Sequence, residues 1–245
     1  MVTSELPVTL DCDVLFGTWP PRAQIPMDVP TVQAKLDSVG IQGALACSAR
    51  GAWFDDIDGN TETIRALADV PGWLPAATIN LRNALRAEEE LDRVVAAGVR
   101  AVRLFGVSQS STPAFPGYQH VVTEAVRRGL VLLVEGDVRT VWSGYVDRGA
   151  TVVFLDVHSY HLADFILLAR REPGFIASTR LLNAPDSIET VVGDVGANHL
   201  AYGSRTPLHA TAPSLIRLRR ARLSEVDRAA VAGGTLQAAL EKGTS

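Results

Sequence analysis

The chain has 245 residues, which suits one domain, because domains commonly run to about 200 residues and barrels to roughly 250. Its 47% hydrophobic and 20% charged residues exclude a disordered chain, a collagen-like chain and a coiled coil. The formal net charge of −4 gives no general attraction to phosphate, so we expect neither nucleic acid nor a membrane as partner. Residues 1–245 are therefore expected to form a single globular domain.

The start of the chain lacks the features of an exported protein. Residues 1–7 have no basic start followed by the apolar run of about 7–15 residues that a secretory signal needs. The longest apolar stretches, such as Leu130–Val134, are far shorter than the roughly 20 residues of a membrane span. Cys12 and Cys47 match no Cys-x-x-Cys pattern and are too few for a disulfide framework. We expect a cytoplasmic protein with reduced cysteines.

Short β-branched apolar runs recur along the chain with amphipathic helical stretches between them. They are Val8–Asp13, Gln42–Ser48, Leu74–Ile79, Ala101–Leu104, Val131–Glu135, Thr151–Asp156, Phe175–Thr179 and Leu200–Tyr202. Consecutive runs begin about 20 to 34 residues apart, which is the length of one strand and one helix with their loops. The pattern predicts eight repeats of strand then helix.

Helix signals occur where this pattern needs them. Pro30 can open the first helix, Asn60 can cap the second, and Gly40, Gly98 and Gly129 can end helices before the next strand. Eight such units in 245 residues predict an α/β fold, a compact closed (β/α)₈ TIM barrel.

An open doubly wound sheet is the alternative architecture. It would need a phosphate-binding Gly-x-Gly-x-x-Gly turn after the first strand, and residues 17–21, Gly-Thr-Trp-Pro-Pro, cannot form that turn. The barrel is therefore favoured.

In a TIM barrel the functional site lies at the carboxyl ends of the strands, whatever the chemistry. Several polar residues are predicted at these ends: Asp11, Asp13, Cys47, Ser48, Asn80, Arg82, Arg103, Glu135, Asp137, Asp156, His158, His161, Thr179, Arg180, Asn183, Ser204 and Arg205. We expect several of them to converge on one pocket.

Two segments resemble motifs of the amidohydrolase superfamily, in its amidohydrolase-related branch of compact metal-dependent hydrolases and decarboxylases. Residues 9–13, Thr-Leu-Asp-Cys-Asp, stand at the position of the family's Asp-x-His-x-His first strand. Residues 195–207 resemble its Gly-x-x-x-hydrophobic-x-x-Gly-Ser-Asp-x-Pro last strand, and residues 223–235 resemble the helical segment that follows. The resemblance covers nearly the whole chain and implies the same barrel fold.

The family's metal ligands are not present at the matching positions. Asp13 and Leu15 replace the two histidines of the first strand, Glu135 and Asp156 replace those of the fifth and sixth strands, and Arg205 replaces the last aspartate. Leucine cannot bind a metal, and a permanently charged guanidinium repels a divalent cation. We therefore expect no zinc site and no other cofactor.

A cluster of charges is expected in place of the metal. Asp13, Glu135 and Asp156 face the position of the cation, and Arg205 supplies a fixed positive charge that can bind carboxylates in a bidentate manner. Such a cluster fits a metal-free catalytic site, and equally a salt-bridge network that only stabilises the barrel. A Mg²⁺ or Mn²⁺ ion held by the three acids is a third alternative, which the charge of Arg205 opposes.

The remaining candidates surround this cluster. His158 could exchange protons near neutral pH, with His161 as the other histidine beside the sixth strand, although either can simply be packed in the fold. Arg103 and Arg180 are candidates for binding an anionic substrate, and a plain ion pair of Arg103 with Glu135 is the alternative.

Three further side chains are expected near the pocket. Ser48, next to Cys47, is a candidate substrate contact or nucleophile, but no Gly-x-Ser-x-Gly motif surrounds it. Trp19 can form a wall of the pocket or contribute to a subunit contact.

Two functional hypotheses follow. The first is an enzyme that hydrolyses or decarboxylates a small carboxylated or amide-containing metabolite without zinc, with Asp13, Glu135, Asp156 and His158 as catalytic groups. Arg103, Arg180, Arg205, Ser48 and Trp19 would bind its substrate. The second is a non-catalytic homologue that binds a ligand or supports an active paralogous subunit. The family resemblance implies a homodimer or a hetero-oligomer with such a paralogue.

Overall fold

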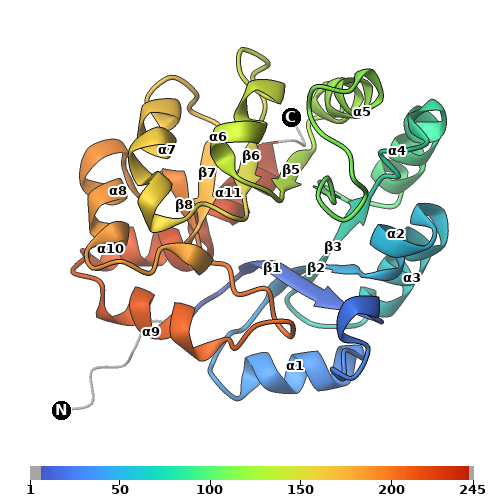
Figure 1. Cartoon of the computed structure of the whole chain (residues 1–245). Helices are drawn as coiled ribbons and strands as arrows, with labels where there is room; N and C mark the ends of the chain where they lie inside the picture. The colour runs from blue at the N-terminus through green and yellow to red at the C-terminus, as the bar shows by residue number, and fades with distance from the viewer. Residues whose placement is uncertain (1–6, 243–245) are drawn as a thin grey trace.

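Eight parallel strands follow one another around a barrel in the computed structural model, which describes residues 7–242 (Figure 1). Each strand pairs with the next one in the chain, in the order β1 to β8. The strands are β1 Asp11–Phe16, β2 Ala44–Ser48, β3 Trp73–Thr78, β4 Ala101–Leu104, β5 Val131–Val134, β6 Val152–Phe154, β7 Phe175–Ser178 and β8 Leu200–Ala201. The predicted (β/α)₈ fold is confirmed, and the open doubly wound alternative is wrong.

Backbone hydrogen bonds join the first and last strands. Cys12 N donates to Tyr202 O at 2.9 Å, and Leu15 N donates to Thr206 O at 2.9 Å. Val14 and Thr206 also form a parallel bridge. Because β8 has only two residues, these bonds beyond its end bring the site residues of β1 and of the segment after β8 together.

Helices surround the strands (Figure 1). They are α1 Val29–Asp37, α2 Arg50–Trp53, α3 Asp56–Leu67, α4 Ala87–Ala96, α5 Pro116–Arg127, α6 Val138–Val141, α7 Leu162–Ala169, α8 Ser187–Val195, α9 Ala212–Arg220, α10 Glu225–Ala229 and α11 Thr235–Lys242. Pro30 lies in the first turn of α1, whose start Asp28 caps by accepting from Thr31 N. Gly98 follows α4 with φ of +87°, a conformation that favours glycine.

The predicted cap at Asn60 is wrong, because α3 begins five residues earlier than expected. Asp55 caps this helix, and Asn60 lies buried inside it. Its amide bridges to β3, since Nδ2 donates to Thr78 O at 2.9 Å and Oδ1 accepts from Thr78 N at 2.7 Å. Nδ2 also donates to Glu90 Oε1 at 2.6 Å. A polar side chain in the helix therefore fastens α3 to the barrel.

The first strand lies three residues later than predicted. It spans Asp11–Phe16 instead of 8–13, and its register shifts at a bulge between Asp11 and Val14. Val14 and Phe16 belong to the apolar layer between barrel and helices, which keeps the strand going past Asp13. Asp13 is therefore a fully buried residue within the strand and not a residue of its exposed end.

Two apolar clusters fill the protein. The larger one lies between the strands and the surrounding helices, and the smaller one contains lumen residues such as Leu45, Leu133 and Ile176. Leu236 of α11 belongs to the smaller cluster. No helix among the described residues is long and apolar enough to cross a membrane. The prediction that residues 1–7 lack a secretory signal concerns mostly residues 1–6, which lie outside the described residues.

Candidate functional site

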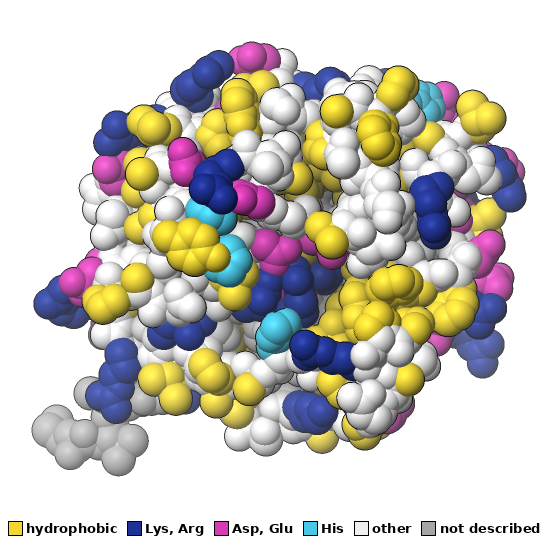
Figure 2. Space-filling view, viewed as in Figure 1, with side chains coloured by type: hydrophobic (Ala, Val, Ile, Leu, Met, Phe, Trp, Pro, Cys, Tyr) yellow, Lys and Arg dark blue, Asp and Glu magenta, His cyan; other side chains and the backbone are white. Residues whose placement is uncertain are grey.

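A hollow of about 530 Å³ opens beside the carboxyl ends of β5, β6 and β7. Its lining includes Asp137, Arg139, Asp156, His158, His161 and Arg180, and we call it the arginine hollow. Figure 2 shows basic side chains recessed at the middle of this face, with acidic and histidine side chains beside them. The predicted convergence of polar residues at this end of the barrel is therefore present in the structure.

Asp13 is the buried centre of the charge cluster. Its Oδ1 accepts from Arg103 Nη1 at 2.6 Å, and its Oδ2 accepts from Arg205 Nε at 3.0 Å. Arg180 Nε lies 3.6 Å from the same Oδ2. Burial alone would raise the pKa of Asp13, but Arg103, Arg205 and Arg180 together lower it well below its usual value. Asp13 is therefore ionised and bonded on both oxygens.

Asp156 connects this centre to the hollow. Its Oδ1 accepts from Arg180 Nη2 and lies 3.1 Å from Arg205 Nη1, and its Oδ2 accepts from Gly136 N at 2.9 Å. Arg205 therefore reaches two of the three acids expected near it, Asp13 and Asp156. No hydrogen bond or ion pair between Arg205 and Glu135 occurs within residues 7–242.

The arginines have more N–H groups than the cluster uses. Among the described residues, Arg103 Nε, Arg180 Nε and Arg205 Nη2 are buried without a hydrogen-bond partner. Burial and the neighbouring Arg205 lower the pKa of Arg180, which is the sign of crowded positive charge. Three guanidiniums thus share two aspartates, Asp13 and Asp156.

Glu135 is set apart from these ion pairs. Its Oε1 accepts from Ser108 N at 3.0 Å, and this is its one hydrogen bond within the described part of the chain. Burial raises its pKa, although Ser108, Arg103 and Arg205 partly offset that rise. The alternative in which Arg103 is simply the ion-pair partner of Glu135 is wrong, because Arg103 pairs with Asp13.

Three aromatic rings stand at the edge of the arginine hollow. His158 stacks on Tyr160 with centroids 4.8 Å apart, and His161 contacts Tyr160 edge-on at 4.4 Å. His158 is partly exposed, and burial, with His161 next, lowers its pKa. It is therefore a neutral base at neutral pH. His161 is buried, with Nδ1 at 3.4 Å from Asp137 Oδ1.

Trp19 lies on the other side of the cluster. Its ring packs edge-on against Trp53, with centroids 5.3 Å apart, and at a tilt against Phe105, with centroids 6.1 Å apart. Phe105 in turn carries the Arg103 guanidinium 4.8 Å from its ring centre. The aromatic side chains thus hold Arg103 in place, which is a positioning role that the sequence alone did not indicate.

The remaining candidates form no hydrogen bond or ion pair with the cluster among the described residues. Ser48 is buried, and its hydroxyl donates to Glu62 and accepts from Arg50 N, so its assignment to substrate binding stays a prediction. Burial raises the pKa of Cys47 to about 11, which leaves little thiolate for attack on a substrate. Arg82 is exposed and does not join the other arginines.

The donor set does not suit a divalent cation. Both oxygens of Asp13 are held by guanidiniums, Leu15 offers no ligand, and Arg205 places positive charge against the two aspartates. One group of described residues has the spacing of metal ligands. It consists of Glu88, His120 and Glu124 on α4 and α5, and it contains no residue of the charge cluster. We derive no chemical step through a metal at the barrel mouth.

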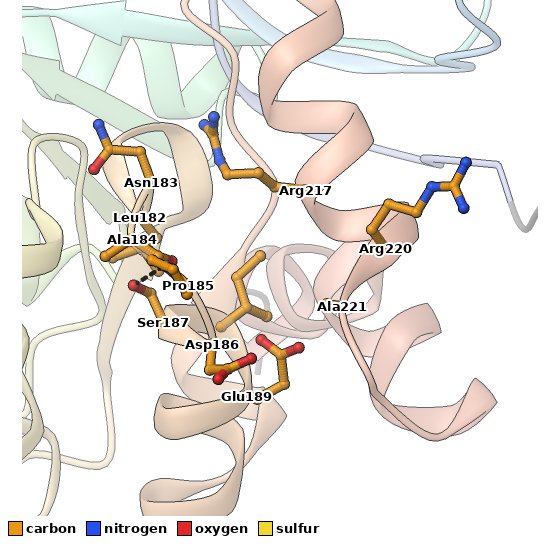
Figure 3. A pocket seen from close by; sticks show the side chains of 11 residues that line it. Leu182, Asn183, Ala184, Pro185, Asp186, Ser187, Glu189, Arg217, Arg220 and Ala221 are labelled. Atoms are coloured by element: carbon orange, nitrogen blue, oxygen red, sulfur yellow. Dashed lines mark hydrogen bonds between the residues drawn. The ribbon is translucent and has the colours of Figure 1, made fainter.

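Another cavity, of about 330 Å³, lies between the segment after β7 and helix α9 (Figure 3). Arg217 and Arg220 extend from α9 on one side, and Asn183 and Ser187 line the other. Arg217 Nη2 donates to the backbone oxygen of Arg180 at 2.6 Å. This region therefore supports the position of Arg180.

Comparisons with known proteins place the fold. No protein-family model matches the sequence, and no curated protein matches it significantly. Solved structures do match. A 2,6-dihydroxybenzoate decarboxylase from Rhizobium has 11% identity and a TM-score of 0.76, with 97% of this chain and 99% of that one covered. A 5-carboxyvanillate decarboxylase from Sphingomonas paucimobilis has 14% identity and a TM-score of 0.73, with 95% and 98% covered.

A third similar structure is a dihydroxybenzoic acid decarboxylase from Polaromonas sp. JS666, solved with bound manganese and 2-nitroresorcinol. It has 11% identity, a TM-score of 0.75, and 96% of this chain and 97% of that one covered. The chain has the fold of these decarboxylases. The resemblance to amidohydrolase-type barrels, inferred above from two sequence motifs, is thus confirmed for the fold.

Some residues of the site escaped the sequence-based prediction. The Asp137–His161 contact joins the segment after β5 to the one after β6, and only the barrel brings them together. A cavity beside Glu135 is lined by hydroxyl groups of residues 110–112, part of the loop after β4. The run Ser-Gln-Ser-Ser-Thr at 108–112 was the available signal, because so many small polar residues after a barrel strand indicate a lining loop.

Proposed function

We propose that this protein is an enzyme that binds a small carboxylated metabolite in the arginine hollow and hydrolyses or decarboxylates it without zinc. The observation that carries the proposal is the excess of guanidiniums, because Arg103, Arg180 and Arg205 share only two aspartates, Asp13 and Asp156. Glu135, the third carboxyl group, ionises less readily because burial raises its pKa. A carboxylate entering the hollow would supply the missing negative charge.

Arg180 lines the hollow, as does Arg139, which pairs with Asp137. Arg205 supports Arg180 through their shared contact with Asp156. A guanidinium binds a carboxylate through parallel N–H bonds, so this pair would fix the anionic end of a substrate. Arg103 is more deeply buried and pairs with Asp13, and its positive charge would add to the attraction for the anionic substrate. The similar barrels named above act on aromatic carboxylates, which supports the same chemical class here.

His158 is the base of this proposal. It lines the hollow together with Asp156, and its lowered pKa keeps it neutral at pH 7, so that it can take a proton from water. This state favours hydrolysis. Decarboxylation would need a proton donor for the carbanion, and Glu135, whose raised pKa favours the protonated form, is the group that could supply it.

The proposal is tested by an activity screen on EDTA-treated protein with carboxylated amides and carboxylic acids, following released amine and carbon dioxide. For a turned-over substrate, His158→Gln should lower kcat by about 10²–10⁴-fold, the usual contribution of acid–base catalysis. His120→Gln is the matched control, because His120 is a partly exposed histidine outside the lining of the hollow, and this variant should keep full activity. Equal activity of the two variants would remove His158 from the mechanism.

One observation favours the second candidate, a non-catalytic ligand-binding or subunit-supporting homologue. Both oxygens of Asp13 are saturated by buried arginines, which is what a structural network would show. In that case carboxylates bind and the Arg180→Gln variant loses binding, but no substrate is turned over by the chain alone or with a paralogous subunit.

A further inference from the structure

A second cavity, of about 440 Å³, adjoins the arginine hollow and has a different chemical character. We call it the hydroxyl cavity, after its lining residues Ser110, Ser111, Thr112, Tyr118, Thr140 and Glu135. Neither a lysine nor an arginine is among the described residues that line it. Its polar side chains therefore carry hydroxyl and carboxyl groups, whereas the lining of the arginine hollow also carries guanidinium groups.

The two spaces share a border. Gly136 and Asp137 line both of them, and Glu135, the preceding residue, lines the hydroxyl cavity alone. Gly136 has φ of +113°, a conformation that a residue with a side chain rarely adopts, so glycine permits the sharp turn at this border. One small molecule lying across residues 135–137 would thus contact both spaces.

Glu135 is an incompletely used buried group at this border. Its side chain is buried, its Oε1 accepts from Ser108 N, and none of the hydrogen bonds within residues 7–242 reaches its Oε2. Oε2 does not belong to the fully enclosed, unpartnered atoms of the described residues, so it is open to the cavity, where it can accept a hydrogen bond from a donor group of a ligand.

The small hydroxyl groups point to the same conclusion. Within the described chain, the side-chain oxygens of Ser110, Ser111 and Thr112 take part in no hydrogen bond. Hydroxyls both donate and accept, whereas carboxylates only accept. Both carboxylate oxygens of Asp137 already accept from Arg139, so Glu135 and the free hydroxyls are the groups that suit this cavity to a ligand rich in N–H or O–H donors.

From this geometry we infer that the hydroxyl cavity is a second subsite, which binds the amine, amide or hydroxyl end of the molecule whose carboxylate the arginine hollow holds. The inference rests on the proposed function and narrows its substrate to a carboxylate with a hydrogen-bond donor at its far end. Glu135 is the residue that distinguishes such a molecule from a plain carboxylate.

The test compares probes with and without the donor group by calorimetric titration: butyrate against 4-hydroxybutyrate, 4-aminobutyrate and succinamate. One or two new hydrogen bonds should make at least one donor-bearing probe bind roughly tenfold more tightly than butyrate. Thr140→Phe fills the cavity from α6 and should remove this gain while leaving the Kd of butyrate unchanged. Val107→Trp fills it from the opposite wall and should do the same.

Ser143→Phe is the matched control, because Ser143 is exposed just after α6 and lies outside both linings. It should keep the tenfold gain. Equal affinity for all four probes, or a gain that survives both cavity-filling variants, overturns the subsite and leaves the proposed carboxylate site standing. Failure of every probe to bind the wild-type protein overturns the subsite and the proposed function together.

Discussion

Arg205→Met removes the guanidinium that joins the two aspartates and keeps a side chain of similar length. It breaks the contacts to Asp13 at 3.0 Å and to Asp156 at 3.1 Å in a side chain that is 14% exposed. Breaking a buried pair commonly costs about 3–5 kcal/mol. Asp13 keeps Arg103 at 2.6 Å and Arg180 at 3.6 Å, so we expect a smaller loss than this, about 2–3 kcal/mol. For a chain of this size the Tm should fall by about 4–12 °C.

The pH dependence has a definite sign. The pKa of Asp13 is lowered in the native protein, so its contribution to stability is present above its ordinary pKa, near about 4, and is lost as pH falls toward the lowered value. In the Arg205→Met variant Asp13 has one guanidinium fewer and takes up its proton at a higher pH. The gap in Tm between the two proteins should therefore be largest at pH 7 and smaller at about pH 4.

Differential scanning calorimetry of both proteins at the two pH values measures this gap. Arg222→Met is the control, because it removes a surface pair with Asp186, and surface changes of this kind stay within about 0.5 kcal/mol. An unchanged Tm for Arg205→Met, or the same loss at pH 7 and pH 4, would refute the charge-replacement reasoning.

Three further predictions concern the rest of the fold. Burial raises the pKa of Asp11 to about 7, so wild-type stability should fall relative to Asp11→Asn as pH rises from about 4 to 7, by up to about 1.4 kcal/mol per pH unit, in urea titrations. Asn60→Ala leaves the backbone of β3 without buried partners and should cost about 2–4 kcal/mol in the same assay, whereas the exposed Thr61→Ala should cost little. Cys12 and Cys47 should not react with a thiol reagent such as Ellman's reagent at pH 8 until the protein is unfolded, because burial raises the pKa of both thiols.

The barrel was predictable because its signal is repeated eight times along the chain. Each repeat consists of a short apolar run, which forms a strand, followed by an amphipathic stretch, which forms a helix. Errors in single boundaries do not change the order of these elements. The errors are local. The strand at Asp11–Phe16 begins late because a bulge shifts its register, and a bulge leaves no clear mark in an apolar run.

The polar residues of the site were predictable in kind but not in pairing. The rule that strand ends converge brings Asp13, Asp156 and Arg205 together. It does not say which arginine binds which acid, so Glu135 was the alternative partner considered for Arg103, which instead pairs with Asp13 across the lumen. Partners that are distant in sequence depend on side-chain length and strand stagger, which periodicity does not contain.

The central claim is that guanidiniums take the place of a divalent cation at the barrel mouth. Calorimetric titration of EDTA-treated protein with Mn²⁺, for the wild type and for Asp13→Asn, tests it most directly. Comparing the two proteins separates the mouth from the surface group Glu88, His120 and Glu124, which the substitution leaves intact. We predict identical isotherms for the two proteins, and an unchanged Kd for butyrate with and without Mn²⁺. Micromolar Mn²⁺ binding that Asp13→Asn abolishes would contradict the account.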